Sequence, residues 1–297
     1  MYTRTMSILQ SIFLGILQGI AEFLPISSSG HLAIAQHLFN LKEIPLLFDV
    51  MLHLATLLAV IIYFRKKIAK LMQAFFRLFF NRKAGKSDNA DSFSDSENSD
   101  GLTGNDRLSR KTIVAIIIAT FITGVIGIAT SKFIPEMPVK VICAGFILTA
   151  LLLIISDLLQ KKRSSENCAG NGDCTGISAK QAAVIGLMQG VGTLPGVSRS
   201  GSTITGALLS GVKRSDAGEF SFIVSIPAIF AAFLLEAKDL GEVASSIGFV
   251  PLLCGCVAAF VSGFAALAWL MKLIKKGRLV WFSAYLIPLG LAGLLFF

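Results

Sequence analysis

The hydrophobic residues of this chain are gathered into long blocks that are separated by polar segments. A hydrocarbon core about 30 Å thick is crossed by about 20 helical residues. Blocks of that length predict six membrane-spanning helices, at 46–64, 112–131, 139–159, 218–237, 248–271 and 279–297. The pattern therefore indicates a polytopic membrane protein.

Two further apolar regions, 7–38 and 181–211, are each interrupted near the middle by proline, glycine and serine. They contain 32 and 31 residues, too many for one crossing and too few for two. We expect each region to form a re-entrant helix–loop–helix hairpin that enters and leaves the membrane on the same side. The predicted fold is an all-α integral membrane protein with about ten helical segments, six spanning and four in two opposed re-entrant hairpins.

The two broken regions resemble each other in sequence. Residues 14–31 read LGILQGIAEFLPISSSGH and residues 185–202 read IGLMQGVGTLPGVSRSGS. At a constant offset of 171, the identical pairs are Gln18 with Gln189, Gly19 with Gly190, Ser27 with Ser198, Ser29 with Ser200 and Gly30 with Gly201. This predicts a single membrane domain over 1–297 that contains repeats at about 7–64 and 181–237. Chance similarity between two turns rich in small residues is the alternative.

The composition supports the membrane interpretation and excludes several other classes. Of the 297 residues, 54% are hydrophobic and only 15% are charged, and the mean hydropathy is +0.73. Soluble globular chains carry about 25% charged residues. A disordered protein, a secreted disulfide scaffold and an ordinary cytosolic enzyme are therefore excluded. Cys168 and Cys174 flank a short polar loop, but two thiols are too few for a zinc site.

Basic residues are distributed unevenly over the connecting segments. If each hairpin returns to its own side, the connections 65–111, 160–180, 212–217 and 272–278 share one face and hold 21 of the 27 Lys and Arg. By the positive-inside rule this face is cytoplasmic, and both termini are expected outside. The hairpins then enter from opposite faces, so the repeats are inverted. Residues 87–106 contain six acidic and no basic residues, which predicts a disordered acidic cytoplasmic loop.

Few ionisable side chains lie deep in the apolar regions. Each costs about 2.5–3.5 kcal/mol on insertion scales, so those that are kept usually mark function. The deep ones are Glu22, His31, His53 and Arg199. Three of the four lie in the broken regions, whereas His53 is interpreted as a packed or rim histidine.

The first broken region combines a carboxylate, an alcohol and a base. Gln18 and Glu22 are four residues apart and share one helix face. Ser27, Ser28 and His31 follow, where a new helix begins with free N–H groups. A hydroxyl acts as a nucleophile only beside a base, and a carboxylate can orient that base or hold a divalent cation. Helix capping is the alternative role of the serines, and burial as a structural side chain is that of His31.

The second broken region repeats this design and adds Arg199. Its guanidinium is a planar bidentate donor suited to phosphate, and Ser198, Ser200 and Thr203 can donate further hydrogen bonds. Two helix N-termini that converge from opposite faces form a buried anion site. Transporters also build their sites from broken helices in inverted repeats. At this point an enzyme and a lipid or anion transporter or flippase both remain open.

The motifs QGIAEFLPISSSGH at 18–31 and PGVSRSGST at 195–203 resemble the bacterial undecaprenyl-diphosphate phosphatases of the bacitracin-resistance type. FDVMLHLATLLAV at 48–60 and EFSF at 219–222 add to the resemblance. It implies an enzyme of the bacterial plasma membrane that hydrolyses undecaprenyl diphosphate to the monophosphate. Such an enzyme recycles the lipid carrier for cell-wall synthesis. The implied partners are this polyprenyl diphosphate and the membrane, with no nucleic acid, and a homodimer is left open.

The resemblance also implies roles for individual residues. Ser28 and His31 correspond to the catalytic serine and histidine, and Arg199 to the phosphate-binding arginine. Gln18 and Glu22 correspond to the element that binds a divalent cation, Mg²⁺ or Ca²⁺. Because Gln18 is a neutral amide where many members have glutamate, Glu22 is expected to carry most of the metal binding. Whether Ser28, activated by His31, attacks phosphorus or His31 activates a water instead is left open by the sequence.

Additional substrate contacts are expected from the serine and threonine side chains at the two breaks: Ser27, Ser198, Ser200 and Thr203. An intramembrane serine hydrolase is disfavoured, because an acyl substrate has no need of Arg199. The sequence thus predicts a buried phosphate site where the two broken regions meet.

Overall fold

A computed structural model describes residues 6–39, 41, 46–80, 104–131, 137–166, 176–236, 247–276 and 279–296 of the chain. Within these ranges every regular element is a helix, as the sequence predicts. In chain order they are α1 (Ile8–Phe23), α2 (Ser28–Leu38), α3 (Leu46–Tyr63), α4 (Arg65–Phe80), α5 (Gly104–Ser131), α6 (Val139–Glu166), α7 (Ala179–Val191), α8 (Arg199–Leu209), α9 (Arg214–Glu236), α11 (Phe249–Lys276) and α12 (Trp281–Phe296). Cys168, Cys174 and the predicted disordered loop up to residue 103 lie outside the described residues, whereas residues 104–106 already belong to α5.

The helices confirm a multi-pass membrane protein. Four of them, α5, α6, α9 and α11, are long and apolar enough to cross a bilayer, and α3 with α4 forms a bent fifth candidate. α12 is apolar but has only 16 residues. By length, the described residues therefore supply four or five full crossings where the sequence predicts six.

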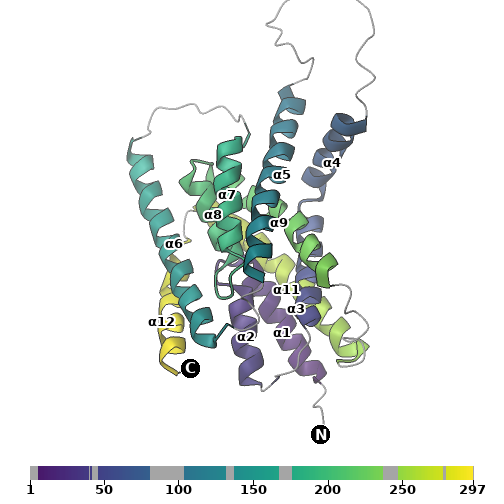
Figure 1. The fold of residues 1–297 in the computed structure, drawn as a ribbon, viewed down its shortest axis with the longest axis vertical. Helices are drawn as coiled ribbons and strands as arrows, with labels where there is room; N and C mark the ends of the chain where they lie inside the picture. The colour runs from purple at the N-terminus through teal and green to yellow at the C-terminus, as the bar shows by residue number, and fades with distance from the viewer. Residues whose placement is uncertain are drawn as a thin grey trace, which may run out of the picture.

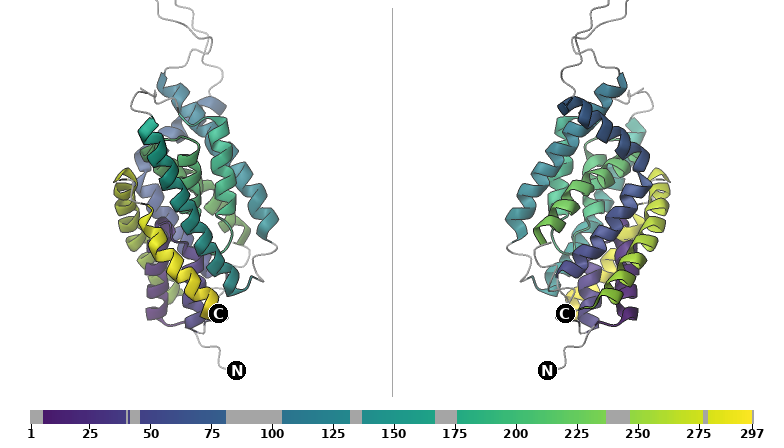
Figure 2. Two further views of the ribbon diagram at one scale, coloured as in Figure 1. Left: turned by 90° about the vertical axis from the view of Figure 1, so that its left-hand side faces the viewer. Right: turned by 90° about the vertical axis from the view of Figure 1, so that its right-hand side faces the viewer.

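The connection predicted at 65–111 is partly helical. Its first sixteen residues form α4, which leaves α3 at an angle of 84°, and its last residues extend α5 (Figure 2). The reason is visible in the apolar residues Ile68, Leu71 and Ala74, which recur every three positions. They turn one side of α4 toward the body of the protein.

The two broken regions form helix pairs whose first helices begin in the same way. At Ser7 and at Ser178 the serine hydroxyl accepts from the backbone of the glutamine three residues later, and that glutamine side chain accepts from the serine backbone. Such a capping box fixes where a helix starts. α1 and α2 occupy the lower half of the molecule, and α7 and α8 the upper half (Figure 1).

Small residues allow α1 to lie directly against α11. A Cβ atom at Gly15 would overlap the carbonyl group of Gly255, and one at Gly19 would overlap the hydroxyl of Ser262. Close approach at small residues is the usual way in which membrane helices associate. Large apolar side chains are left on the outer surface, where Phe121 and Leu295 are 72% and 82% exposed.

The breaks of the two helix pairs meet inside the molecule. Ser200, in the second break, donates a hydrogen bond from Oγ to the carbonyl oxygen of Leu24 in the first, at 3.4 Å. Gly196 has φ +81°, and a side chain there would overlap the carbonyl group of Ile142. Only glycine satisfies both the backbone angle and the close approach. This packing sets the position of the residues that begin α8.

Candidate active site

Glu22, in the last turn of α1, is the centre of a cluster of polar side chains. Its Oε1 accepts a hydrogen bond from Arg199 Nη2 at 2.9 Å. Its Oε2 accepts from Ser28 Oγ at 2.7 Å and from Gln18 Nε2 at 3.1 Å. The side chain of Glu22 is only 9% exposed. A buried carboxylate is costly unless it is paired and hydrogen-bonded, and Glu22 is both.

Arg199 is the residue that joins the second break to the first. It is the first residue of α8, and its guanidinium reaches Glu22 across 177 positions of the sequence. The side chain is 21% exposed, so it faces both the carboxylate and open space. An arginine has five N–H donors, and within the described residues the contact with Glu22 uses Nη2 alone. Donors therefore remain for an anionic ligand.

Ser27 and Ser198 are the caps of the two helices that begin at the breaks. Ser27 Oγ accepts from the N–H of Gly30 at 3.4 Å, and Ser198 Oγ accepts from the N–H of Gly201 at 3.1 Å. Because Ser27 caps α2, the hydroxyl of Ser28 is free to turn toward Glu22. Among the described residues other than glycine, only Ser27 has a positive φ, 70°. Such strain costs about 1–3 kcal/mol and is concentrated at functional sites.

His31 does not pair with Ser28, although the sequence places the two residues three apart. Its Nδ1 donates to the carbonyl oxygen of Ser27 at 2.8 Å, because a carbonyl oxygen only accepts. Its Nε2 lies 2.8 Å from the hydroxyl of Tyr285, which donates to it when the ring is neutral. The ring also lies against Phe146. His31 therefore braces the strained turn at Ser27 and contacts neither Glu22 nor Ser28.

His53, interpreted from the sequence as a packed or rim histidine, belongs to the site. Its Nε2 lies 3.4 Å from Glu22 Oε2. Its Nδ1 donates to the carbonyl oxygen of Asp49 at 2.7 Å. Nε2 can therefore donate to the Glu22 carboxylate only when it also carries a proton. The spacing of residues along α3 gave no signal of this contact. The presence of a histidine deep in an apolar block was the available clue.

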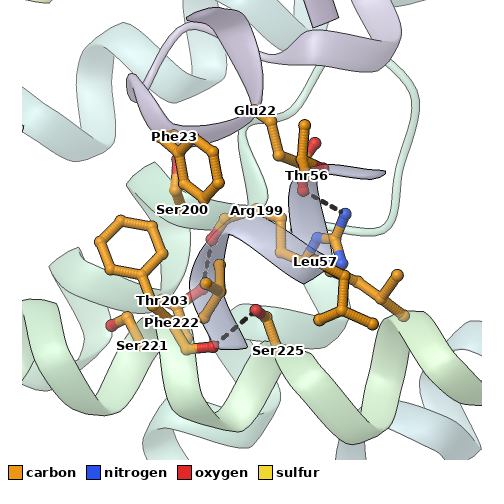
Figure 3. Close-up of a pocket in the computed structure, with 12 residues that line it drawn as sticks. Glu22, Phe23, Thr56, Leu57, Arg199, Ser200, Thr203, Ser221, Phe222 and Ser225 are labelled. Atoms are coloured by element: carbon orange, nitrogen blue, oxygen red, sulfur yellow. Dashed lines mark hydrogen bonds and ion pairs between the residues drawn. The ribbon is translucent and has the colours of Figure 1, made fainter. Parts of the chain in front are cut away.

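Glu22 and Arg199 open into a pocket that spans about 320 Å³, part of it continuous with the surroundings (Figure 3). Ser200 and Thr203, which the sequence analysis names as substrate contacts, line it together with apolar side chains of α1, α3 and α9. Ser221 also lines it, and its buried hydroxyl has no hydrogen-bond partner among the described residues. A hydroxyl without a partner, in the same pocket as Arg199, is suited to an anionic ligand, and the sequence analysis did not single out Ser221.

The residues around Glu22 fit a hard cation held partly by substrate. Among the described residues no group of three His, Cys, Asp or Glu is placed to hold a metal ion. Gln18 is fully buried, and its Oε1 has no hydrogen-bond partner within the same residues. One carboxylate and one amide oxygen are the kind of ligands that Mg²⁺ and Ca²⁺ take, with phosphate oxygens completing the shell. The site therefore lacks a cage for a permanently bound metal but can share one with a phosphate.

Comparison with known proteins gives one consistent result. The sequence model of the family described as bacitracin resistance protein BacA matches residues 11–292. A protein named undecaprenyl-diphosphatase from Treponema denticola is 43% identical over 292 residues, which cover 98% of either chain. Proteins of the same name from Borreliella burgdorferi and Desulfosudis oleivorans are 39% and 36% identical, and the matches cover 95–96% of each chain.

Proposed function

Because this chain belongs to the bacitracin resistance protein BacA family, we propose that it hydrolyses undecaprenyl diphosphate to undecaprenyl monophosphate and phosphate in the bacterial plasma membrane. The observation that carries the proposal is the Glu22–Arg199 pair, which lies at the junction of two helix N-termini and opens into a pocket. In a pair of this kind the arginine can exchange its carboxylate partner for a phosphate. The interpretation as a lipid transporter or flippase is not favoured, since the relatives are named for the diphosphatase reaction.

Binding of the diphosphate begins at Arg199. The guanidinium exchanges its hydrogen bond to Glu22 for bidentate bonds to the terminal phosphate, which carries more negative charge than a carboxylate. Ser200 and Thr203 supply hydroxyl groups to the same pocket, and the N-terminus of α8 contributes its free N–H groups. Ser27 and Ser198 keep the two helix starts in place as caps. Substrate binding thus neutralises phosphate charge and releases the carboxylate of Glu22.

The released carboxylate then acts on the hydroxyl that already donates to it. Ser28 Oγ attacks the terminal phosphorus while Glu22 Oε2 accepts the hydroxyl proton. The bond from phosphorus to the bridging oxygen breaks, and undecaprenyl monophosphate leaves with the electron pair. Water then attacks the phosphoserine, the bond from phosphorus to Ser28 Oγ breaks, and the proton held by Glu22 returns to Oγ as phosphate departs. The 2.7 Å contact supports the choice of Glu22 rather than His31 as the base for Ser28.

His31 is a positioning residue in this mechanism. It holds the carbonyl group of Ser27 through Nδ1 and is itself held by Tyr285, so it fixes the turn that presents Ser28. A divalent cation held by Glu22, Gln18 and the substrate would supply further positive charge to the phosphate oxygens. Positioning and charge neutralisation are most of what phosphoryl transfer requires.

The membrane arrangement is part of the proposal. The two broken helix pairs are re-entrant hairpins that enter from opposite faces and form inverted repeats. The basic connections are cytoplasmic and both termini are outside. The start of α1 and the end of α12 lie at one end of the molecule, and the ends of α4 and α6 lie at the other, which supports this orientation (Figure 1).

The test is phosphate release from undecaprenyl diphosphate by the purified protein in detergent. Glu22→Gln keeps the size and hydrogen-bonding capacity of the side chain but removes the charge and the basic oxygen, so turnover is expected to fall at least about a hundredfold. Asp216→Asn is the control, because it removes a carboxylate charge from an exposed residue of α9 that is not among those that line the pocket. EDTA is expected to lower wild-type turnover, and Mg²⁺ or Ca²⁺ to restore it.

Equal turnover in the two variants would overturn the assignment of Glu22. No phosphate release by the wild type, combined with undecaprenyl diphosphate flux across vesicles, would overturn the diphosphatase in favour of the transporter. Turnover that is indifferent to EDTA would remove the cation from the mechanism. A phosphoserine trapped at Ser28 by rapid acid quenching is expected, and full turnover by Ser28→Ala would instead show that water attacks directly.

A further inference from the structure

The helix α4 does not belong to the site and is not used in the mechanism above. It follows α3 after a single residue, at an angle of 84°. Five of its first thirteen residues are basic: Arg65, Lys66, Lys67, Lys70 and Arg77. A segment with this much charge is too costly to continue across the membrane. A helix nearly perpendicular to a spanning helix instead runs along the membrane surface.

The residues of α4 separate into three faces of distinct chemistry. One face, with Ile68 and Leu71, is partly buried against the hydrophobic core. A second face carries Met72 and Phe76, which are 48% and 52% exposed and four residues apart. Because an α-helix turns by 3.6 residues, residues four apart lie one above the other and form a stripe along the helix.

The third face lies beside the apolar stripe and is basic. Lys66 and Lys70 are again four residues apart, and both are exposed. Arg77 continues the same row two turns further along. An exposed apolar stripe flanked by a row of cations is the arrangement of helices that lie in a membrane interface, with apolar side chains in the acyl region and cations among the headgroups.

We propose that α4 is an interfacial helix that binds the anionic phospholipids of the membrane surface on the side of the basic connections. Charge complementarity carries this choice of partner, because the basic row lies beside a stripe that needs an apolar phase. The acidic segment 87–106, which follows α4 in the chain, is the rival occupant of the basic row. Its sequence is mostly Ser, Asp, Asn and Gly, with Phe93 and Leu102 as its two large apolar residues, so its composition suits the basic row better than the stripe of Met72 and Phe76.

The same helix is tied to the wall of the pocket. Lys67 of α4 forms an ion pair with Glu219 of α9, and Glu219 lies two residues before the pocket residue Ser221. Lipid bound along α4 would therefore contact a helix that is joined through the Lys67–Glu219 ion pair to α9, which lines the pocket.

The experiment is hydrogen exchange of the full-length protein, read by mass spectrometry over 65–80. The protein is placed in nanodiscs of phosphatidylcholine alone or of phosphatidylcholine mixed with anionic phosphatidylglycerol. Each lysine at an anionic surface strengthens binding about fivefold, so exchange in 65–80 is expected to be at least about fivefold slower in the anionic discs. The difference is expected to shrink at high salt.

A double variant, Lys66→Gln with Lys70→Gln, is expected to lose the difference between the two lipids while it still releases phosphate. Lys275→Gln with Lys276→Gln removes the same charge from the exposed end of α11 and is expected to keep the difference. Equal exchange in the two lipids, or slow exchange that survives Lys66→Gln with Lys70→Gln, overturns the proposal. Slow exchange in both lipids that disappears when the acidic residues of 87–106 are neutralised overturns it in favour of the acidic segment.

Discussion

At the scale of single residues, the site is organised by one carboxylate and the groups that compensate for its burial. Arg199, Ser28 and Gln18 all donate to Glu22, and His53 approaches it from α3. Removing a partner from a buried ion pair typically costs about 3–5 kcal/mol, because a charge is left without compensation. In the proposed mechanism the same dependence makes Glu22 responsive to an incoming phosphate, which would compete for Arg199.

Replacement of His53 tests whether its contact with Glu22 matters for the reaction. His53→Ala removes the contact of Nε2 with the Glu22 carboxylate at 3.4 Å, and a polar contact with a charged group is typically worth about 1.5–3 kcal/mol. We therefore expect turnover to fall by about tenfold to a hundredfold. His53→Gln retains an N–H donor and is expected to recover most of the loss. The measurement is the initial rate of phosphate release, and a fully active His53→Ala would return His53 to the class of packing residues.

Replacement of Ser221 tests whether its orphan hydroxyl receives the substrate. Because the hydroxyl has no partner among the described residues, Ser221→Ala is expected to leave thermal stability unchanged and to raise the KM for undecaprenyl diphosphate about tenfold. Ser225→Ala is the matched control in the same pocket, since Ser225 Oγ already donates to the carbonyl oxygen of Phe222 at 2.8 Å. Equal KM values for the two variants would argue against a substrate contact at Ser221.

At the scale of elements, function depends on how each broken helix pair turns. The breaks are held by capping serines, by the strained backbone of Ser27 and by the contact of Gly196 with α6. Each break leaves a helix N-terminus inside the protein, and the dipole of that helix favours an anion there. A break also determines the direction of a helix outside the site. After Phe64 the chain bends by 84°, and α4 becomes an element separate from α3.

Substitution of Gly196 tests the packing of the second break. Gly196→Ala places a side chain at φ +81° and against the carbonyl group of Ile142, so we expect the protein to lose at least about 2 kcal/mol of stability. Gly124→Ala is the matched control, because no atom lies within 4 Å of the position that its methyl group would take, and the helix α5 gains up to about 1 kcal/mol from alanine. Thermal melting in detergent measures both, and a Gly196→Ala variant as stable as Gly124→Ala would contradict this account of the break.

At the scale of the whole molecule, two helix pairs occupy opposite halves and meet at their breaks (Figure 1). Long apolar helices surround them, with α5 beside α7, α6 beside α12 and α11 beside α1. The lipid substrate can therefore keep its tail among apolar helices while its diphosphate reaches the polar junction. Because the two pairs approach each other from opposite halves, the N-termini of α2 and α8 both lie in the interior (Figure 1).

The proposed orientation predicts the side on which each segment is accessible. An epitope fused to either terminus is expected to bind antibody on intact spheroplasts, because the proposal places both termini outside. An epitope inserted in the acidic segment 87–106 is expected to bind only after the cells are opened. Immunofluorescence before and after permeabilisation makes the comparison, and the reverse pattern would invert the topology.

The sequence by itself determined the class of the protein and most of its helices. Hydrophobic blocks, helix caps and breaks are local patterns, and local patterns depend on residues within one or two turns. The predicted helix starts at 46 and 139 coincide with those of α3 and α6. The prediction that Gln18 and Glu22 lie on one face of a helix is confirmed by their hydrogen bond. The helix α4 was missed because its basic residues were interpreted as part of a connecting segment, although its apolar residues have helical spacing.

Only the tertiary structure decided which side chains meet. Short spacing suggested that Ser28 would pair with His31, but the helix start turns Ser28 toward Glu22 and His31 toward Ser27 and Tyr285. His53 reaches Glu22 from another helix, and Ser221 enters the pocket from α9. Such contacts join residues that are far apart in the sequence and depend on how the helices pack. Local sequence patterns therefore do not predict them. The sequence therefore predicted a buried phosphate site at the two breaks, and packing decided which side chains lie together there.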